Sequence, residues 1–158
     1  MAEIILEMRD IDKSFPGVQA LRKAQLELKR GEVHCLLGEN GAGKSTLMKI
    51  LSGAQPADSG TILLEGKELH INSPYHAQQL GISMIYQEFN LSPFLSVGEN
   101  IFLGREPKRP GTPFIHWSKL YSDAAAILKR IRVDMDVKQP VNELSVAQQQ
   151  MVEIAKAI

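Results

Sequence analysis

The sequence predicts an α/β fold in which a strand-rich N-terminal part precedes a helical part. Three observations carry this prediction. Near the start, the apolar residues Ile4, Leu6 and Met8 alternate with polar ones, as in a strand with one buried face. A continuous apolar run at residues 33–37 then stops at a glycine, and helix-forming residues follow. After about Ser92 the apolar residues recur at helical spacing.

The strands are predicted in the first half of the chain. Alternation predicts strands at residues 4–8 and 26–28, the second ending at a turn over residues 29–31. Residues 33–37 are expected to form a strand buried on both faces. A further strand is expected at 61–64 after a turn at 58–60, and a short buried strand at 82–86. A helix from Lys44 to about Leu51 separates the two groups.

Helices are predicted in the second half. Helical spacing covers residues 97–103 and 117–131, with a loop rich in Pro and Gly at 107–113. A last helix is expected from Val146, with Ser145 as its N-cap. The predicted organisation is therefore a core with antiparallel strands at 1–91, a helical arm at 92–139 and a final segment at 140–158.

Composition excludes some classes of function. The 158 residues contain 18 basic and 18 acidic side chains, so there is no positive field of the kind that nucleic-acid binding needs. The single cysteine, Cys35, cannot form an internal disulfide, which indicates a reducing compartment. No apolar run approaches the roughly 20 residues of a membrane helix. We expect a cytoplasmic protein that reaches a membrane only through a partner.

The glycine-rich segment after residue 37 fits the pattern G-x-x-x-x-G-K-[ST] of a phosphate-binding loop. Glycines let successive backbone N–H groups face a phosphate at a helix N-terminus. Lys44 is expected to reach the β- and γ-phosphates of ATP, Ser45 to ligate Mg²⁺, and Thr46 to donate to the α-phosphate. The alternative is an ordinary glycine turn before a capped helix, but the preceding apolar run favours a nucleotide site. The predicted binding residues are Gly38, Glu39, Asn40, Gly41, Ala42, Gly43, Lys44, Ser45 and Thr46.

From Phe15 to Ile158 the sequence resembles the ATP-binding-cassette ATPases, because four landmarks occur in that family's order. They are the segment 13–18, the phosphate loop, Gln87 and the segment 144–150. The resemblance implies a P-loop NTPase fold of this type. It also implies that Phe15 stacks on adenine with Val18 nearby, and that Gln87 contacts Mg²⁺ and the attacking water. Lys44 and Gln87 are thus the expected catalytic residues, and Ser45 and Gln87 the expected metal contacts.

The segment 144–150 resembles the family's signature, with two residues exchanged. The family has two glycines where this chain has Val146 and Ala147. The resemblance implies that Ser145, Val146, Ala147 and Gln148 hold the γ-phosphate of ATP bound to a second cassette, in a head-to-tail dimer or in a tandem half. The Cβ atoms of valine and alanine leave the phosphate less room to approach the backbone than two glycines would. Together with the phosphate loop and residues 86–91, the segment is similar to the first cassette of bacterial importers of ribose, xylose, arabinose or galactose.

This resemblance implies ATP and Mg²⁺ as cofactors and a set of partners. These are a second cassette, permease subunits contacted by the Gln87 loop and the helical arm, and, indirectly, a periplasmic sugar-binding protein. The expected location is the cytoplasmic face of the membrane. The alternatives are a cassette ATPase of a non-transport or non-sugar system, or a module that binds ATP without hydrolysis.

The family's later motifs do not occur in this sequence. The Asp-Glu pair with the general base is missing, and the four histidines, at 34, 70, 76 and 116, do not match the switch histidine. We therefore expect a cassette truncated after the signature helix, with little or no hydrolysis by this chain alone. We also expect the strands at 33–37 and 82–86 to lack the strand that pairs between them, which favours self-association.

Overall fold

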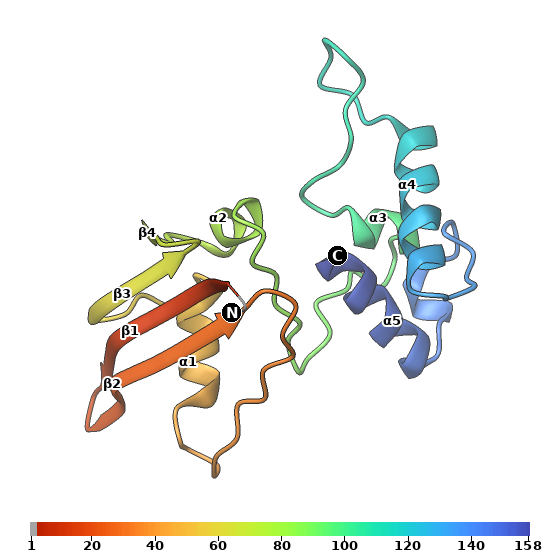
Figure 1. The fold of residues 1–158 in the computed structure, drawn as a ribbon. Coiled ribbons are helices and arrows are strands. Elements are labelled where there is room, and N and C mark those ends of the chain that lie inside the picture. Colours follow the sequence, from red (N-terminus) through yellow and green to blue (C-terminus); the bar gives the residue numbers. More distant parts are fainter. Residues whose placement is uncertain (1–2) are drawn as a thin grey trace. The chain divides into compact units, whose positions relative to one another are not determined.

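The structure is a computed structural model that describes residues 3–158, and its backbone divides into two compact units (Figure 1). The first unit ends at Ser83, and the second unit is Met84–Ile158. The first contains the four strands and helices α1 and α2, whereas the second contains helices α3, α4, α5 and a short 3-10 helix, η1. Each unit has a hydrophobic core of its own.

A four-stranded antiparallel sheet forms the first unit. Its strands are β1 (Ile4–Phe15), β2 (Val18–Lys29), β3 (Ser59–Leu64) and β4 (Lys67–Leu69), in the order β2-β1-β3-β4. Pro16 and Gly17 join β1 to β2, and the φ of Gly17 is 79°. A glycine with positive φ meets the requirement of a type II turn at its third position, and proline is common at the second. The predicted strands at 4–8, 26–28 and 61–64 are confirmed, although β1 and β2 are longer than the alternation indicated.

A bulge explains why the alternation in β1 stops after Met8. Leu6 and Met8 are buried, but beyond Asp10 the buried residues are Ile11 and Lys13. Asp10 has a φ of 49°, and the pairing of β1 with both neighbouring strands shifts register in this region. An inserted residue reverses the faces on which later side chains lie. The bulge therefore turns Ile11 into the core.

Helix α1 (Lys44–Leu51) packs against one face of this sheet (Figure 1). Its buried residues Leu47 and Ile50 join a core of sheet residues, namely Leu6, Met8, Ile11, Leu21 and Ile62. The helix has the bounds that the sequence predicted. A short helix, α2 (Pro74–Gln79), begins where the Ser73 side chain accepts a hydrogen bond from the N–H of His76.

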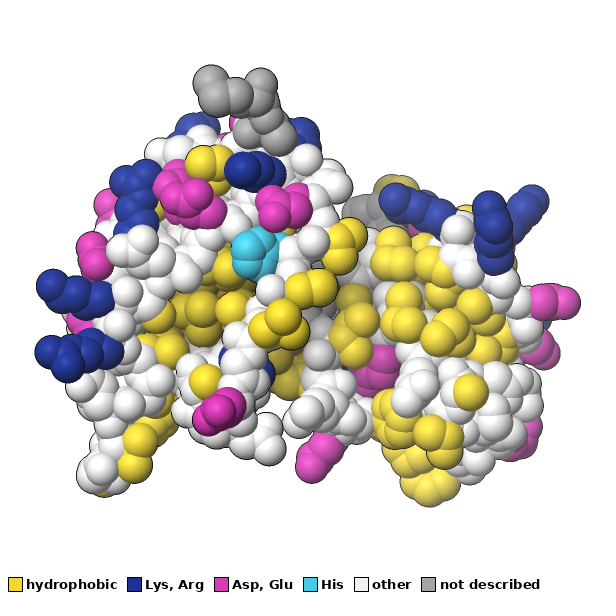
Figure 2. Space-filling model, turned by 60° about the horizontal axis from the view of Figure 1, so that its bottom comes forward, with side chains coloured by type: hydrophobic (Ala, Val, Ile, Leu, Met, Phe, Trp, Pro, Cys, Tyr) yellow, Lys and Arg dark blue, Asp and Glu magenta, His cyan; other side chains and the backbone are white. Residues whose placement is uncertain are grey.

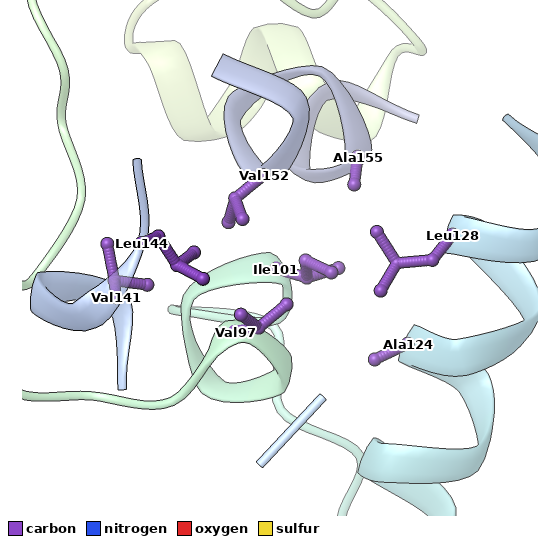
Figure 3. Close-up of a cluster of buried hydrophobic side chains, with 8 residues drawn as sticks. All are labelled: Val97, Ile101, Ala124, Leu128, Val141, Leu144, Val152 and Ala155. Carbon is purple, nitrogen blue, oxygen red and sulfur yellow. The ribbon is translucent and has the colours of Figure 1, made fainter. Parts of the chain in front are cut away.

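The second unit is helical, as predicted. It consists of α3 (Val97–Ile101), α4 (Trp117–Arg130), η1 (Val141–Glu143) and α5 (Val146–Ala157). Side chains from all four point toward one another in the core that Figure 3 shows, which contains Val97, Ile101, Ala124, Leu128, Val141, Leu144, Val152 and Ala155. Burial of these apolar groups is the main force that holds the short helices together. Within residues 3–158 no helix has the length and apolar character that crossing a bilayer needs.

The prediction of buried strands at 33–37 and 82–86 is wrong for the described residues. Both segments are irregular, and none of the strands within residues 3–158 pairs with them. Val33 is 91% exposed, Leu37 is 90% exposed and Ile85 is 49% exposed. A strand needs a neighbour for its backbone N–H and C=O groups, so an apolar run without one stays irregular. On the face shown in Figure 2, hydrophobic side chains gather in several places at the surface.

Candidate nucleotide-binding site

The predicted phosphate loop lies in the first unit, between an exposed irregular segment and α1. Its glycines Gly41 and Gly43 have φ values of 87° and 83°, in the left-handed region that favours glycine. Gly43 is the N-cap residue of α1 and provides no side-chain cap. The first N–H groups of α1 therefore have no partner within the helix, and the positive end of the helix dipole lies at the same place.

Gly43 is also required by its surroundings. A Cβ atom at this position would lie 2.5 Å from the backbone oxygen of Ala20 and 2.6 Å from Cδ2 of Leu21. Both neighbours belong to β2, and Leu21 is buried in the core. The absence of a side chain at Gly43 thus allows the start of α1 to lie directly against the hairpin. By contrast, a Cβ at Gly41 would meet no atom of the described chain within 4 Å.

Lys44 supplies a positive charge inside the loop. Its Nζ donates hydrogen bonds to the backbone oxygens of Gly38, at 2.7 Å, and Glu39, at 2.8 Å. These two bonds hold the ammonium group over the carbonyls of the loop, close along the chain to the N-terminus of α1. A cation, glycine backbone and an open helix N-terminus together suit a phosphate group. The residues present thus fit a nucleotide phosphate.

The residues predicted for the phosphates lie together in this loop and in the first turn of α1. They are Gly38, Glu39, Asn40, Gly41, Ala42, Gly43, Lys44, Ser45 and Thr46. Ser45 is exposed and Thr46 is partly buried, so the hydroxyl expected to ligate Mg²⁺ is accessible.

Phe15 and Val18, the residues expected beside adenine, flank the two-residue turn between β1 and β2. They pair across the hairpin, and they are 39% and 62% exposed, respectively. Val18 starts the strand whose Ala20 carbonyl lies next to Gly43. The hairpin thus connects the aromatic side chain to the phosphate loop within the same unit.

Three charged residues in and beside the segment that precedes Phe15 were not identified as site residues from the sequence. Lys13 is only 9% exposed, and its Nζ lies 2.6 Å from Oδ1 of Asp58. The hydrogen bond from Lys13, together with one from the backbone N–H of Ser14, holds the pKa of Asp58 below its ordinary value. Asp12 accepts hydrogen bonds from the N–H of Lys23 and from the Ser59 hydroxyl. Lys13 lies in the segment 13–18 and Asp58 in the turn predicted at 58–60. No pattern in the sequence predicts that these two residues, 45 positions apart, form an ion pair.

Gln87 and the predicted signature residues lie in the second unit. Gln87 is exposed and follows the irregular residues 82–86. The second unit therefore carries Gln87, whereas the first carries the phosphate loop.

The signature segment forms the start of α5. Ser145 is its N-cap, and a capping box joins it to Gln148. The Ser145 N–H donates to Oε1 of Gln148 at 2.9 Å, and the Ser145 hydroxyl accepts from the N–H of Gln148 at 3.4 Å. Val146 is 63% exposed and Ala147 is exposed as well. The side chains of Ser145 and Gln148 thus stabilise the helix start, which presents its first turn to solvent.

Comparison with known proteins identifies the family. A family model described as ABC transporter matches residues 21–158. A ribose import ATP-binding protein of Streptomyces avermitilis is 53% identical over 157 residues, which are 99% of this chain and 30% of the relative. A ribose/galactose/methyl galactoside import ATP-binding protein of Burkholderia cenocepacia is 53% identical over 154 residues, 98% of this chain and 30% of the relative. The chain therefore spans about 30% of the length of these curated relatives.

Solved structures show the same fold. A nucleotide-free ATP-binding cassette from an ABC transporter aligns with a TM-score of 0.81 at 27% identity, over 98% of this chain and 64% of that one. A cassette in its ADP conformation aligns with the same TM-score, identity and coverage. The resemblance predicted from the sequence is thus confirmed, and the chain belongs to the ABC transporter family as part of an ATP-binding cassette.

Proposed function

We propose that this chain is the nucleotide-binding part of an ATPase subunit that drives the import of a monosaccharide. The observation that carries the proposal is the phosphate loop, in which Lys44 lies over the loop carbonyls beside the open N-terminus of α1. The names of relatives that are 51–53% identical, all import ATP-binding proteins for ribose or galactose, supply the substrate class.

The residues of the first unit have distinct roles in this proposal. Lys44 and the N–H groups from Gly38 to Thr46 bind the phosphates, and Ser45 holds Mg²⁺ against them. Phe15 and Val18 contact the adenine. Bound Mg²⁺-ATP supplies the phosphoryl group that is transferred to water. The chain's own contribution is to bind and orient it.

The second unit contributes in two ways. Gln87 would contact the metal and orient the attacking water, and its loop would pass the state of the nucleotide on to the permease. Ser145, Val146, Ala147 and Gln148 contact the γ-phosphate of ATP on a second cassette through the exposed first turn of α5. In this proposal residues 1–91 form the ATP-binding core, residues 92–139 form the helical arm, and residues 140–158 form the signature segment. The arm and the Gln87 loop contact permease subunits at the cytoplasmic face of the membrane, and a periplasmic sugar-binding protein acts through them.

Calorimetric titration of Mg²⁺-ATP tests the proposal. It is best done with the natural polypeptide that contains this chain, comparing wild type with Lys44→Ala and Lys49→Ala. Hydrogen bonds to charged groups contribute about 1.5–3 kcal/mol, so Lys44→Ala should weaken binding at this site about 10- to 150-fold. Lys49 lies in the last turn of the same helix, away from the loop, and its variant should bind like wild type.

Two outcomes would contradict the proposal. Equal affinities for wild type and Lys44→Ala would mean that the loop does not bind the nucleotide. If ATP bound normally but hydrolysis did not rise in the complex with permease and sugar-loaded binding protein, the import function would be wrong while the nucleotide site would stand.

A further inference from the structure

An ion pair between a buried lysine and a partly exposed aspartate lies at the segment that precedes Phe15, the residue proposed to contact the base. Lys13 is 9% exposed, and its Nζ forms an ion pair with Oδ1 of Asp58 at 2.6 Å. The other carboxylate oxygen, Oδ2, accepts the N–H of Ser14 at 2.7 Å. One carboxylate thus holds two consecutive residues, Lys13 and Ser14, that immediately precede Phe15.

The same lysine also contacts the ring of Phe15. Its Nζ lies over the ring at 5.9 Å from the centroid, within the range of a cation–π interaction. A planar base that stacks on Phe15 must therefore use the opposite face, unless Lys13 moves away. Phe15 is 39% exposed at the end of a hairpin, so its ring is accessible, and Lys13 contacts it from one face.

Asp58 itself is held in place independently of Lys13. Its backbone N–H donates to the carbonyl of Asp12 at 2.9 Å. The Asp12 carboxylate accepts from Ser59, the neighbour of Asp58, and from the N–H of Lys23 on β2. Removing the Asp58 carboxylate should therefore release Lys13 and Ser14 while these backbone contacts remain.

We infer that Asp58, acting through Lys13 and Ser14, is a positioning residue that holds Phe15 in the conformation that stacks on the nucleotide base. The inference rests on the proposed function, since it requires that Phe15 contacts the base. It adds a specific consequence: Asp58 and Lys13 affect recognition of the base, and the phosphate loop affects recognition of the phosphates. Pre-ordering a side chain before binding raises affinity without any new contact to the ligand.

The experiment compares two ligands in the natural polypeptide that contains this chain. Mg²⁺-ATP carries a base, whereas Mg²⁺-tripolyphosphate offers only the phosphates. Both are titrated into wild type, Asp58→Asn, Phe15→Ala and the double variant, with Lys44→Ala as the baseline for other sites. Glu7→Gln is the matched control, because it removes a carboxylate from the same strand, β1, that is hydrogen-bonded to Arg9 and not to Lys13 or Ser14.

Replacing an aromatic side chain that stacks on a base with alanine lowers affinity about 5- to 150-fold. Phe15→Ala should therefore lower the affinity for ATP within that range. Asp58→Asn should lower the affinity for ATP less, about 3- to 10-fold, because Phe15 is still present but is no longer held in place. The double variant should be no weaker than Phe15→Ala. Tripolyphosphate affinity should stay unchanged in all three variants, which a general loss of structure would not produce. Thermal unfolding of each variant verifies that it is folded.

The outcomes separate the inference from the function on which it rests. Equal loss of ATP and tripolyphosphate affinity in Asp58→Asn would overturn the inference, because the effect would then be structural. Unchanged ATP affinity in that variant, or the same loss in Glu7→Gln, would overturn it as well. In each of these three cases the phosphate site would stand. If Lys44→Ala left both affinities unchanged, the proposed function would fall, and the inference with it.

Discussion

Replacing Gly43 with alanine tests whether this residue joins the phosphate loop to the hairpin. The new methyl group would lie 2.5 Å from the Ala20 carbonyl oxygen and 2.6 Å from Cδ2 of Leu21, well inside contact distance. The first neighbour is backbone of β2, which cannot move without shifting the strand, and the second is a side chain packed in the core. Gly41→Ala is the matched control, since its φ is similar and its methyl group meets no atom of the described chain within 4 Å.

Both variants force alanine into a left-handed backbone conformation, but only Gly43→Ala also overpacks the core. The left-handed conformation costs a residue with a Cβ about 1–2 kcal/mol, which applies to both. Overpacking adds about 1–3 kcal/mol, which applies only at Gly43. We therefore expect losses of about 2–5 kcal/mol for Gly43→Ala and about 1–2 kcal/mol for Gly41→Ala.

Hydrogen exchange measured by mass spectrometry reads this loss locally, on peptides that contain α1. A factor of ten in opening corresponds to about 1.4 kcal/mol, so exchange of the α1 amides should rise about 30- to 4,000-fold in Gly43→Ala and about 5- to 30-fold in Gly41→Ala. Peptides from α4 in the second unit serve as the internal reference. Equal effects of the two substitutions would refute the close-contact argument, because strain alone would then explain both.

Three other perturbations test the core, the helix cap and the ion pair. Asn100 is fully buried, and its side chain bonds to the backbone of Ser92, Leu95 and Ser96, so Asn100→Leu should destabilise the second unit by about 1–3 kcal/mol for each group left unpaired. Urea unfolding followed by Trp117, the only tryptophan, measures this, and the exposed Asn142→Leu should have little effect. Ser145→Ala removes the cap of α5 and should cost about 0.5–2 kcal/mol in the same assay, while an unchanged midpoint would show that the capping box does not contribute. The pKa of Asp58 is lowered by Lys13 and then by the N–H of Ser14, so the stabilisation is complete above the unfolded pKa of about 3.9 and disappears as pH falls through the folded value. On acidification from about pH 5 to about pH 3, Asp58→Asn should lose less stability than wild type in circular dichroism, and parallel losses would contradict this assignment.

Local patterns determined much of the candidate site. The spacing of glycine, lysine and serine predicted both the loop and the start of α1 at Lys44, because turn conformation and helix initiation depend on neighbouring residues. The cap at Ser145 followed from the same kind of information, as did the helix predicted at 117–131, which is α4. In each of these cases the physical cause lies within a few positions of the residue concerned.

Other features could be decided only by the tertiary structure. The sequence could not predict which residues of β1 are buried beyond Asp10. A bulge there reverses the faces on which the side chains lie, and it depends on the pairing of β1 with two other strands. The apolar run at 33–37 looks like a buried strand, yet it stays irregular because a strand forms only where a neighbour pairs with its backbone. The sequence alone determined which groups can bind a phosphate. Only the fold brought Asp58 to Lys13 and Ala20 to Gly43, because contacts between distant positions depend on packing that no local pattern records.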